Sequence, residues 1–225
     1  MALLVKICGL KTPDALDAAL GAGADMVGFV FFPPSPRNLG IEAARALGAR
    51  VGGRARKVAL SVDATDAELD RAVEALKPDM LQLHGKETPE RVVAVRSRFQ
   101  LPVMKALPIE ARSDLAPIRI YEKVADWLLF DARAPREATR PGGLGKTFDW
   151  SLLENVAPGV PFMLSGGLDA ENVAGALRIT RAPAVDVSSG VERAPGEKDP
   201  EKIRDFIRAA RMADNAQTAK FASTA

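Results

Sequence analysis

Short apolar runs and helix-forming stretches alternate along the whole chain, and this alternation constrains the fold more than any other feature. Between the apolar runs, Ala, Leu, Glu and Arg recur at helical spacing, and the last of eight helical segments is predicted at 199–212. Alternating strands and helices are typical of a parallel sheet. The predicted strands are 3–8, 25–31, 57–62, 79–83, 102–106, 125–131, 161–165 and 184–188.

Eight such units predict an α/β protein that is a single closed (β/α)₈ barrel, the TIM-barrel architecture, over residues 1–212. The alternative is an open, doubly wound sheet. That fold usually carries a glycine-rich dinucleotide fingerprint after its first strand, and the CGLKTP segment there is not one. Residues 213–225 are small and polar, and we expect them to form a frayed tail.

Charge and composition exclude several classes of protein. The chain has 31 basic and 29 acidic residues, a balance that predicts neither a nucleic-acid nor a membrane partner. No apolar run approaches the roughly 18 residues of a membrane-spanning helix, and the N-terminus does not resemble a signal peptide. One cysteine cannot form an internal disulfide. A cytoplasmic enzyme or binding protein is therefore expected.

Side chains alternate between the two faces of a strand, so their parity predicts which of them enter the barrel. In the first strand Leu3, Val5 and Ile7 form a uniformly apolar face that suits the surrounding helices, which turns Lys6 and Cys8 inward. The same test places further polar side chains inside, near the strand ends where barrel enzymes carry their active sites. They are Gln82, His84, Asp131, Asp186 and Ser188.

Parity also predicts an ion pair. Lys6 and Asp186 belong to the first and last strands, which are neighbours in a closed barrel. We expect the two side chains to lie within salt-bridge or water-bridged reach of each other.

Two glycine- and serine-rich segments suggest a phosphate site of the kind found in phosphate-binding barrels. Gly166 and Gly167 follow the seventh strand and precede a predicted helix, whose N-terminus would favour an anion. Ser188, Ser189 and Gly190 follow the eighth strand. Loops at these two places are the usual phosphate site of the fold. Either segment alone could be only a turn, but together they predict a substrate with a terminal phosphate.

Seven segments, in order along the chain, form a joint signature that spans nearly the whole predicted barrel. They are KICGL at 6–10, GADMVGFVFFPPSPR at 23–37, LQLHG at 81–85, LLFDA at 128–132, GGLGKTFDW at 142–150, LSGGL at 164–168 and VDVSSGVE at 185–192. Each segment alone is a weak signal, but jointly they are specific, and the sequence resembles the phosphoribosylanthranilate isomerase family of tryptophan biosynthesis.

The resemblance implies an Amadori rearrangement of N-(5-phosphoribosyl)anthranilate to 1-(2-carboxyphenylamino)-1-deoxyribulose 5-phosphate, with no metal or organic cofactor. It assigns the general base to Cys8 and the general acid to Asp131. Lys6, one layer below, is expected to favour the thiolate form of Cys8. The partner is a small phosphosugar, and the protein is a monomer or a homodimer.

The resemblance also implies the substrate contacts. Arg37 would bind the anthranilate carboxylate with its guanidinium fork, and Asp186 would contact the sugar hydroxyls. Ser188 and the Gly166–Gly167 pair would bind the phosphate. His84 matches the family's histidine after the fourth strand, although a lone histidine is more often structural.

One loop departs from the family pattern. Leu144 stands where the family often carries a small polar residue, so only backbone contacts from Gly143 and Gly145 are expected there. The arginine-rich loop of residues 132–145 is predicted to be a mobile lid over the site.

Three other functions fit the sequence less well. Indoleglycerol-phosphate synthase carries an extension before its first strand and a lysine on an early strand, whereas this predicted barrel starts at residue 3. A non-catalytic phosphosugar-binding module would not need Cys8 and Asp131. A metalloenzyme would need more ligands than one histidine and one cysteine on separated strands.

Overall fold

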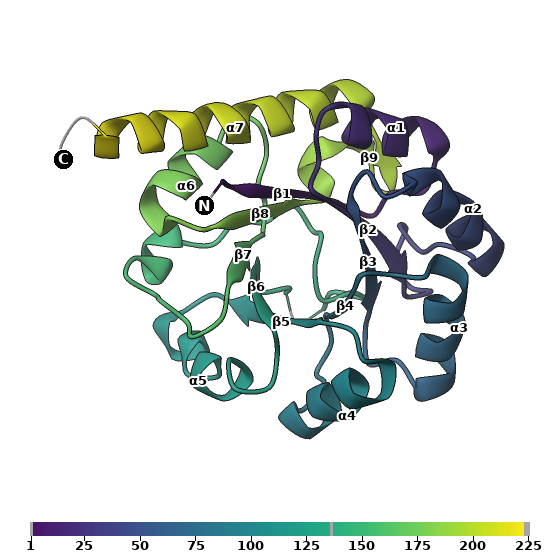
Figure 1. The fold of residues 1–225 in the computed structure, drawn as a ribbon. Coiled ribbons are helices and arrows are strands. Elements are labelled where there is room, and N and C mark those ends of the chain that lie inside the picture. The colour runs from purple at the N-terminus through teal and green to yellow at the C-terminus, as the bar shows by residue number, and fades with distance from the viewer. Residues whose placement is uncertain (1, 136, 223–225) are drawn as a thin grey trace.

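Eight parallel strands close into a barrel in chain order, and β1 pairs with β8 (Figure 1). The computed structural model describes residues 2–135 and 137–222. All eight predicted strands are present, so the closed barrel is confirmed and the open doubly wound sheet is wrong. The strands are β1 Leu4–Cys8, β2 Met26–Phe31, β3 Arg56–Ser61, β4 Met80–Leu83, β5 Val103–Ile109, β6 Trp127–Ala132, β7 Phe162–Leu164 and β8 Ala184–Val187.

Helices surround the barrel, but the connection from β6 to β7 departs from the predicted pattern. Only the 3₁₀ turn η2, Trp150–Leu153, stands where an α-helix was expected, because most of this connection is a loop at the barrel mouth. The α-helices of the described residues are α1 Pro13–Gly21, α2 Ile41–Val51, α3 Asp66–Leu76, α4 Pro89–Phe99, α5 Ile118–Tyr121, α6 Val173–Thr180 and α7 Pro200–Ala222.

Helix α7 corrects the predicted end of the regular structure. It continues past residue 212 to Ala222 and runs beyond the edge of the barrel (Figure 1). No Gly or Pro follows Pro200, and several alanines favour continued helix. Asp214 accepts a hydrogen bond from the backbone N–H of Leu3 at 3.1 Å, which ties this part of the helix to β1. The helix therefore extends beyond the predicted 199–212, the fraying of the tail stays a prediction, and 223–225 lie outside the described residues.

Strand parity sorts the side chains as predicted. Leu3, Val5 and Ile7 join the large apolar core between strands and helices. A second apolar cluster fills the lower part of the barrel interior and is rich in methionine, with Met26, Met80, Met104 and Met163. Above it come charged and polar side chains, so the floor of the barrel is apolar and its mouth is polar.

A short hairpin follows β8 and was not predicted from the sequence. The 3₁₀ turn η3, Ser189–Val191, leads into β9, Glu192–Ala194, which pairs antiparallel with β10, Glu197–Lys198.

No helix of the described residues is long and apolar enough to cross a membrane.

Candidate active site

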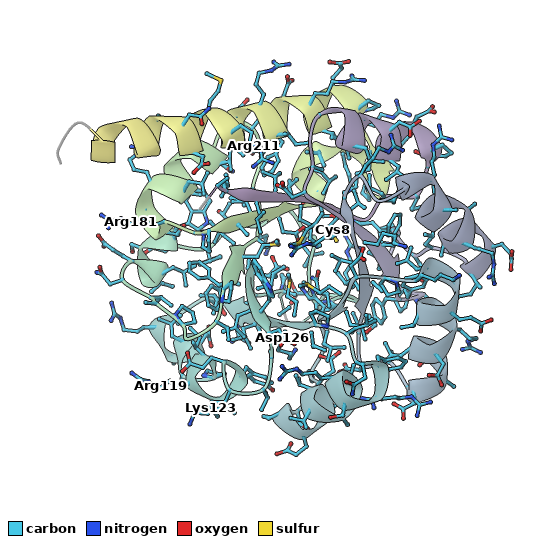
Figure 2. All side chains as sticks on the ribbon, in the orientation of Figure 1. Cys8, Arg119, Lys123, Asp126, Arg181 and Arg211 are labelled. Carbon is cyan, nitrogen blue, oxygen red and sulfur yellow. The ribbon has the colours of Figure 1, made fainter. Side chains whose placement is uncertain are left out.

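A cavity opens at the C-terminal mouth of the barrel and gathers side chains from most of the strands. Figure 2 shows Cys8 inside the ring of strands, while Arg119, Lys123 and Arg181 lie at its periphery. Of the ten site residues predicted from the sequence, only Gly190 is not part of the cavity wall. The nine that line it are Cys8, Arg37, His84, Asp131, Gly166, Gly167, Asp186, Ser188 and Ser189.

The predicted ion pair beneath Cys8 is confirmed. Lys6 Nζ lies 2.9 Å from Asp186 Oδ1, and both side chains are buried. The neighbouring Ser165 hydroxyl donates to Asp186 Oδ2 at 3.4 Å. Burial alone would lower the pKa of Lys6, but Asp186 and Cys8 outweigh it, so the pKa is raised and the ammonium stays charged.

Lys6 favours the thiolate form of Cys8, as expected, but the burial of the sulfur outweighs it. Burial is the largest influence and raises the pKa of the Cys8 thiol. Lys6 acts in the expected direction and lowers it, but Asp186 raises it again, and the net shift is upward. Without substrate, Cys8 is therefore a thiol at neutral pH.

Gly28 makes room for the Cys8 side chain. The two residues are partners across β1 and β2, and a Cβ at Gly28 would lie 2.9 Å from Cys8 Sγ and 3.1 Å from Cys8 Cα. It would also lie 3.2 Å from Lys6 Cε. The absence of a side chain on β2 thus sets the position of the sulfur.

We expect Gly28→Ala to displace Cys8 and lower kcat at least about tenfold, with overpacking costing about 1–3 kcal/mol of stability. Steady-state kinetics and urea unfolding measure the two effects. Gly21→Ala, at the exposed end of α1 with open space around it, is the matched control. A Gly28→Ala enzyme with wild-type kcat would show that the sulfur position is not critical.

Asp131 is held by a chain of hydrogen bonds from β4. His84 Nε2 lies 3.1 Å from Asp131 Oδ2, and Gln82 Nε2 lies 3.0 Å from His84 Nδ1. Because the Gln82 amide nitrogen donates to Nδ1, this network assigns the ring proton of His84 to Nε2. Asp131 Oδ1 accepts from the backbone N–H of Ala132 at 2.9 Å. Both carboxyl oxygens are thus oriented before a substrate binds.

Arg37 is buried at the rim, and most of its guanidinium is already engaged. Its Nε and Nη2 bind the two carboxylate oxygens of Glu192 at 2.7 and 2.8 Å, and Nη2 also donates to the Gly143 carbonyl at 3.0 Å. Within the described part of the chain, Nη1 is the guanidinium nitrogen without a hydrogen bond. Glu192 ends the VDVSSGVE segment, and no pattern in the sequence indicates that it pairs with Arg37.

The phosphate loops are built differently from the prediction. Gly166 and Gly167 have φ of +88° and +62°, and a Cβ on either would collide with the neighbouring backbone of Ala132 or Lys146. Helix α6 begins only at Val173, and the Asp169 side chain accepts from the backbone N–H groups of Glu171 and Asn172, which precede the helix. A turn therefore separates the glycine pair from the helix, and a contact between the helix N-terminus and the phosphate stays a prediction.

Ser188 and Gly190 serve the loop after β8 more than the cavity. The Ser188 hydroxyl donates to the Cys8 carbonyl at 3.1 Å, so its hydrogen is not available to a phosphate. Gly190 packs against the Leu168 carbonyl, where any side chain would overlap, and it joins the two loops. Ser189 lines the cavity near Gly145.

The loop after β6 covers the mouth of the cavity. Gly142 lies against Asp131 and His84, and Gly143 accepts the hydrogen bond from Arg37. Arg140 and Leu144 also line the cavity, and no pattern in the sequence indicates this place for Arg140. Residue 136 of this loop lies outside the described residues. The backbone contacts expected from Gly143 and Gly145 and the mobility of the lid stay predictions.

The residues in this cavity suit acid–base chemistry on an anionic substrate. Cys8 and Asp131 come from β1 and β6, which are not adjacent in the barrel, and both face the same space. Among the described residues, no group of three or more His, Cys, Asp and Glu side chains could hold a metal ion.

Comparisons with known proteins agree with this geometry. Residues 5–209 match the family model described as N-(5'-phosphoribosyl)anthranilate (PRA) isomerase. The chain is 64% identical over 214 residues to the N-(5'-phosphoribosyl)anthranilate isomerase of Bradyrhizobium sp. (strain ORS 278), covering 95% of this chain and 98% of that protein.

Solved structures give the same result. The crystal structure of phosphoribosyl anthranilate isomerase from Thermotoga maritima matches with a TM-score of 0.84 and 34% identity, over 93% of this chain and 99% of that one. A phosphoribosyl anthranilate isomerase in complex with reduced 1-(o-carboxyphenylamino)-1-deoxyribulose 5-phosphate matches with a TM-score of 0.79 and 31% identity, over the same shares. With its sequence, its barrel and its cavity in agreement, the chain belongs to the N-(5'-phosphoribosyl)anthranilate isomerase family.

Proposed function

We propose that the chain performs the Amadori rearrangement of N-(5-phosphoribosyl)anthranilate in tryptophan biosynthesis, with Cys8 as general base and Asp131 as general acid. One observation carries the assignment of roles. Cys8 and Asp131 are a thiol and a carboxyl group that face one cavity from non-adjacent strands, so a sugar between them meets an acid on one side and a base on the other. The family membership supports the reaction.

The reaction needs two proton transfers. Asp131 gives a proton to the furanose ring oxygen, and the C1–O bond opens to a Schiff base. Cys8 then takes the C2 proton, the electron pair of the C–H bond forms the enolamine, and this tautomerises to the aminoketose. His84 donates to Asp131 from Nε2, so it acts by orienting the acid.

The two ends of the cavity suit the two anionic ends of the substrate. At one end, Arg37 Nη1 is free to donate to the anthranilate carboxylate. At the other end, backbone N–H groups of the loops after β7 and β8 bind the phosphate, around Gly166, Gly167 and Ser189. Asp186, already paired with Lys6, borders the space for the sugar hydroxyls.

The alternatives are weaker. A non-catalytic phosphosugar-binding module would have no use for a buried thiol facing an oriented carboxyl group. The family match separates the chain from indoleglycerol-phosphate synthase. We further propose a cytoplasmic enzyme that is a monomer or a homodimer and needs no cofactor.

The direct test is turnover. Phosphoribosylanthranilate is generated in situ, and its fluorescence is followed after addition of a catalytic amount of the protein, with the aminoketose identified by mass spectrometry. We expect many turnovers per molecule, unchanged by prior dialysis against EDTA. Stoichiometric binding without product would instead identify a binding module.

The pH dependence tests how the two catalytic groups share a proton. Catalysis needs Asp131 protonated and Cys8 ionised, that is, one proton between the pair. Because burial raises the pKa of Cys8, the sulfur keeps its proton at neutral pH, and only a minority of molecules carry the thiolate. A proton exchanged within the pair leaves the number of bound protons unchanged, so this exchange does not depend on pH.

We therefore expect a flat single-turnover rate through neutral pH. The rate falls in alkali, when the pair loses the proton that Cys8 held. The raised pKa of Cys8 moves the alkaline fall above the ordinary thiol value of about 8.5. Stopped-flow measurements from pH 5 to 10 check this, and a rate that climbs about tenfold per pH unit through 7–8 would indicate a lone thiol base instead.

A further inference from the structure

Three buried charged side chains lie together at the rim of the cavity, one of them in its wall and two behind it. Arg37 Nε and Lys198 Nζ bind the same carboxylate oxygen, Glu192 Oε1, at 2.7 and 2.8 Å. The side chains of Arg37, Glu192 and Lys198 are only 5%, 4% and 2% exposed. Glu192 and Lys198 stand on β9 and β10, the hairpin that follows β8, and neither lines the cavity. We call these three residues the rim triad.

The rim triad connects both anion-binding ends of the site. Lys198 Nζ also donates to the Ser188 carbonyl at 2.8 Å and to the Ser188 hydroxyl at 3.1 Å. That hydroxyl in turn donates to the Cys8 carbonyl at 3.1 Å. The Lys198 ammonium group therefore binds both Glu192, the partner of Arg37, and the loop after β8. Through the Ser188 hydroxyl it is also linked to the end of β1.

The rim triad carries one positive charge more than it has negative charges. Burial raises the pKa of Glu192, but Arg37 and Lys198 outweigh it, so the pKa is lowered and the carboxylate is ionised. Two cations then face one anion in a buried place, where an uncompensated charge is costly. A carboxylate bound at Arg37 Nη1 would complete the balance.

We propose that Glu192 and Lys198 are positioning residues of the isomerase. Glu192 turns Arg37 so that Nη1 alone meets the substrate carboxylate, and Lys198 couples this ion pair to the Ser188 loop at the phosphate end. The inference rests on the proposed function of the same site. It adds two residues that touch no substrate atom and act through Arg37 and Ser188.

The proposal has a pH signature. The pKa of Lys198 is lowered to about 8, chiefly by burial and also by the charge of Arg37. Glu192 and Cys8 act in the opposite direction and raise it. Within residues 2–135 and 137–222, these three are the charged or titratable groups that act on Lys198, from β9, the β2–α2 loop and β1. Above pH 8 the free enzyme loses this proton, the rim triad becomes neutral, and an anion gains less by binding. Affinity for substrate therefore falls as the pH rises through 8, below the alkaline fall of the rate that the raised pKa of Cys8 predicts.

The test measures binding without turnover. The probes are reduced 1-(o-carboxyphenylamino)-1-deoxyribulose 5-phosphate, which has both anionic ends, and inorganic phosphate, which has one. Glu192→Gln should weaken the reduced analogue about tenfold or more and inorganic phosphate less than about threefold. Lys198→Met should weaken both, because Lys198 holds both ends. In both variants the change should appear in KM far more than in kcat.

Lys202→Met is the matched control. Lys202 Nζ donates to the backbone carbonyl of Glu192 at 2.9 Å from the exposed side of α7, so it touches the same residue without entering the rim triad. We expect wild-type constants for both probes in this variant. If Lys202→Met and Lys198→Met weaken binding of the probes equally, the cause is a general loosening of the hairpin, and the proposal is overturned.

The wild-type enzyme provides a test that does not depend on whether the variants fold. From pH 7.5 to 9.5 a phosphate monoester stays a dianion, so titration of the analogue does not interfere. The Kd of the reduced analogue should rise about tenfold across this range, with uptake of protons on binding near pH 8. A constant Kd would overturn the inference while leaving the proposed function intact. A wild-type protein that neither binds the analogue nor turns over substrate would instead overturn the proposed function.

Discussion

Cys8→Ala is expected to lower kcat by about 10²–10⁴-fold while Kd for the reduced product analogue changes less than about threefold. The variant removes the proposed base and leaves Arg37 and both phosphate loops in place. Cys8→Ser keeps the size of the side chain but replaces the thiol with a far weaker acid, so the hydroxyl is not ionised near neutral pH. The kcat of both variants is expected to fall by a similar factor.

The measurement is single-turnover kinetics with substrate carrying deuterium at C2. If Cys8 removes this proton, Cys8→Ala slows that step alone and shows the full isotope effect of C–H cleavage. Thermal unfolding of each variant controls for a general loss of structure. Wild-type kcat in Cys8→Ala would transfer the role of base to another residue.

Asp131→Asn is expected to lower kcat by a similar factor of about 10²–10⁴, for a different reason. An amide has no acidic proton to give to the ring oxygen. It also has only one acceptor oxygen, whereas Asp131 accepts from both His84 and the Ala132 backbone. The substitution therefore removes the acid and disturbs its orientation, and opening of the furanose ring becomes the slow step.

The isotope experiment separates the two roles. In Asp131→Asn, ring opening precedes and limits removal of the C2 proton, so deuterium at C2 should have almost no effect on the rate. His84→Asn, which keeps the carboxyl group but removes the ring that orients it, should lose less activity than Asp131→Asn. A full deuterium effect in Asp131→Asn would show that this residue does not serve ring opening.

The sequence was most informative where side chains obey a strict period. Along β1, β6 and β8 the alternation of faces is a property of the strand, so Lys6, Cys8, Asp131 and Asp186 could be placed inside the barrel from position alone. The Lys6–Asp186 contact followed from the neighbouring places of the first and last strands in a closed barrel.

Irregular segments gave no comparable signal. Glu192 and Lys198 belong to a short hairpin, and Arg140 belongs to a loop, so no period in the sequence marks which way they point. Gly166 and Gly167 were expected to precede a helix, but α6 begins only at Val173, after a turn in which the Asp169 side chain accepts from two backbone N–H groups. The helix predicted between β6 and β7 is absent for a similar reason. Most of this connection is a loop that covers the cavity, and such a loop has no regular apolar period in its sequence.

The state of Cys8 shows a different limit. The direction of the Lys6 effect was correct, but the net pKa depends on how completely the sulfur is removed from water. That quantity belongs to the packed structure, including the bare α-carbon of Gly28.

Closure of the barrel between its two ends has a consequence for biosynthesis. The ammonium of Lys6 meets its partner 180 positions later in the chain, and the backbone around Cys8 is anchored by a serine equally distant. A nascent chain emerging from the ribosome therefore carries its catalytic thiol from the start but can build no working pocket until the last strand and hairpin have been released. Premature termination before β8 leaves a lysine without a counter-ion in an unclosed sheet, a product suited to proteolysis and unable to compete for substrate.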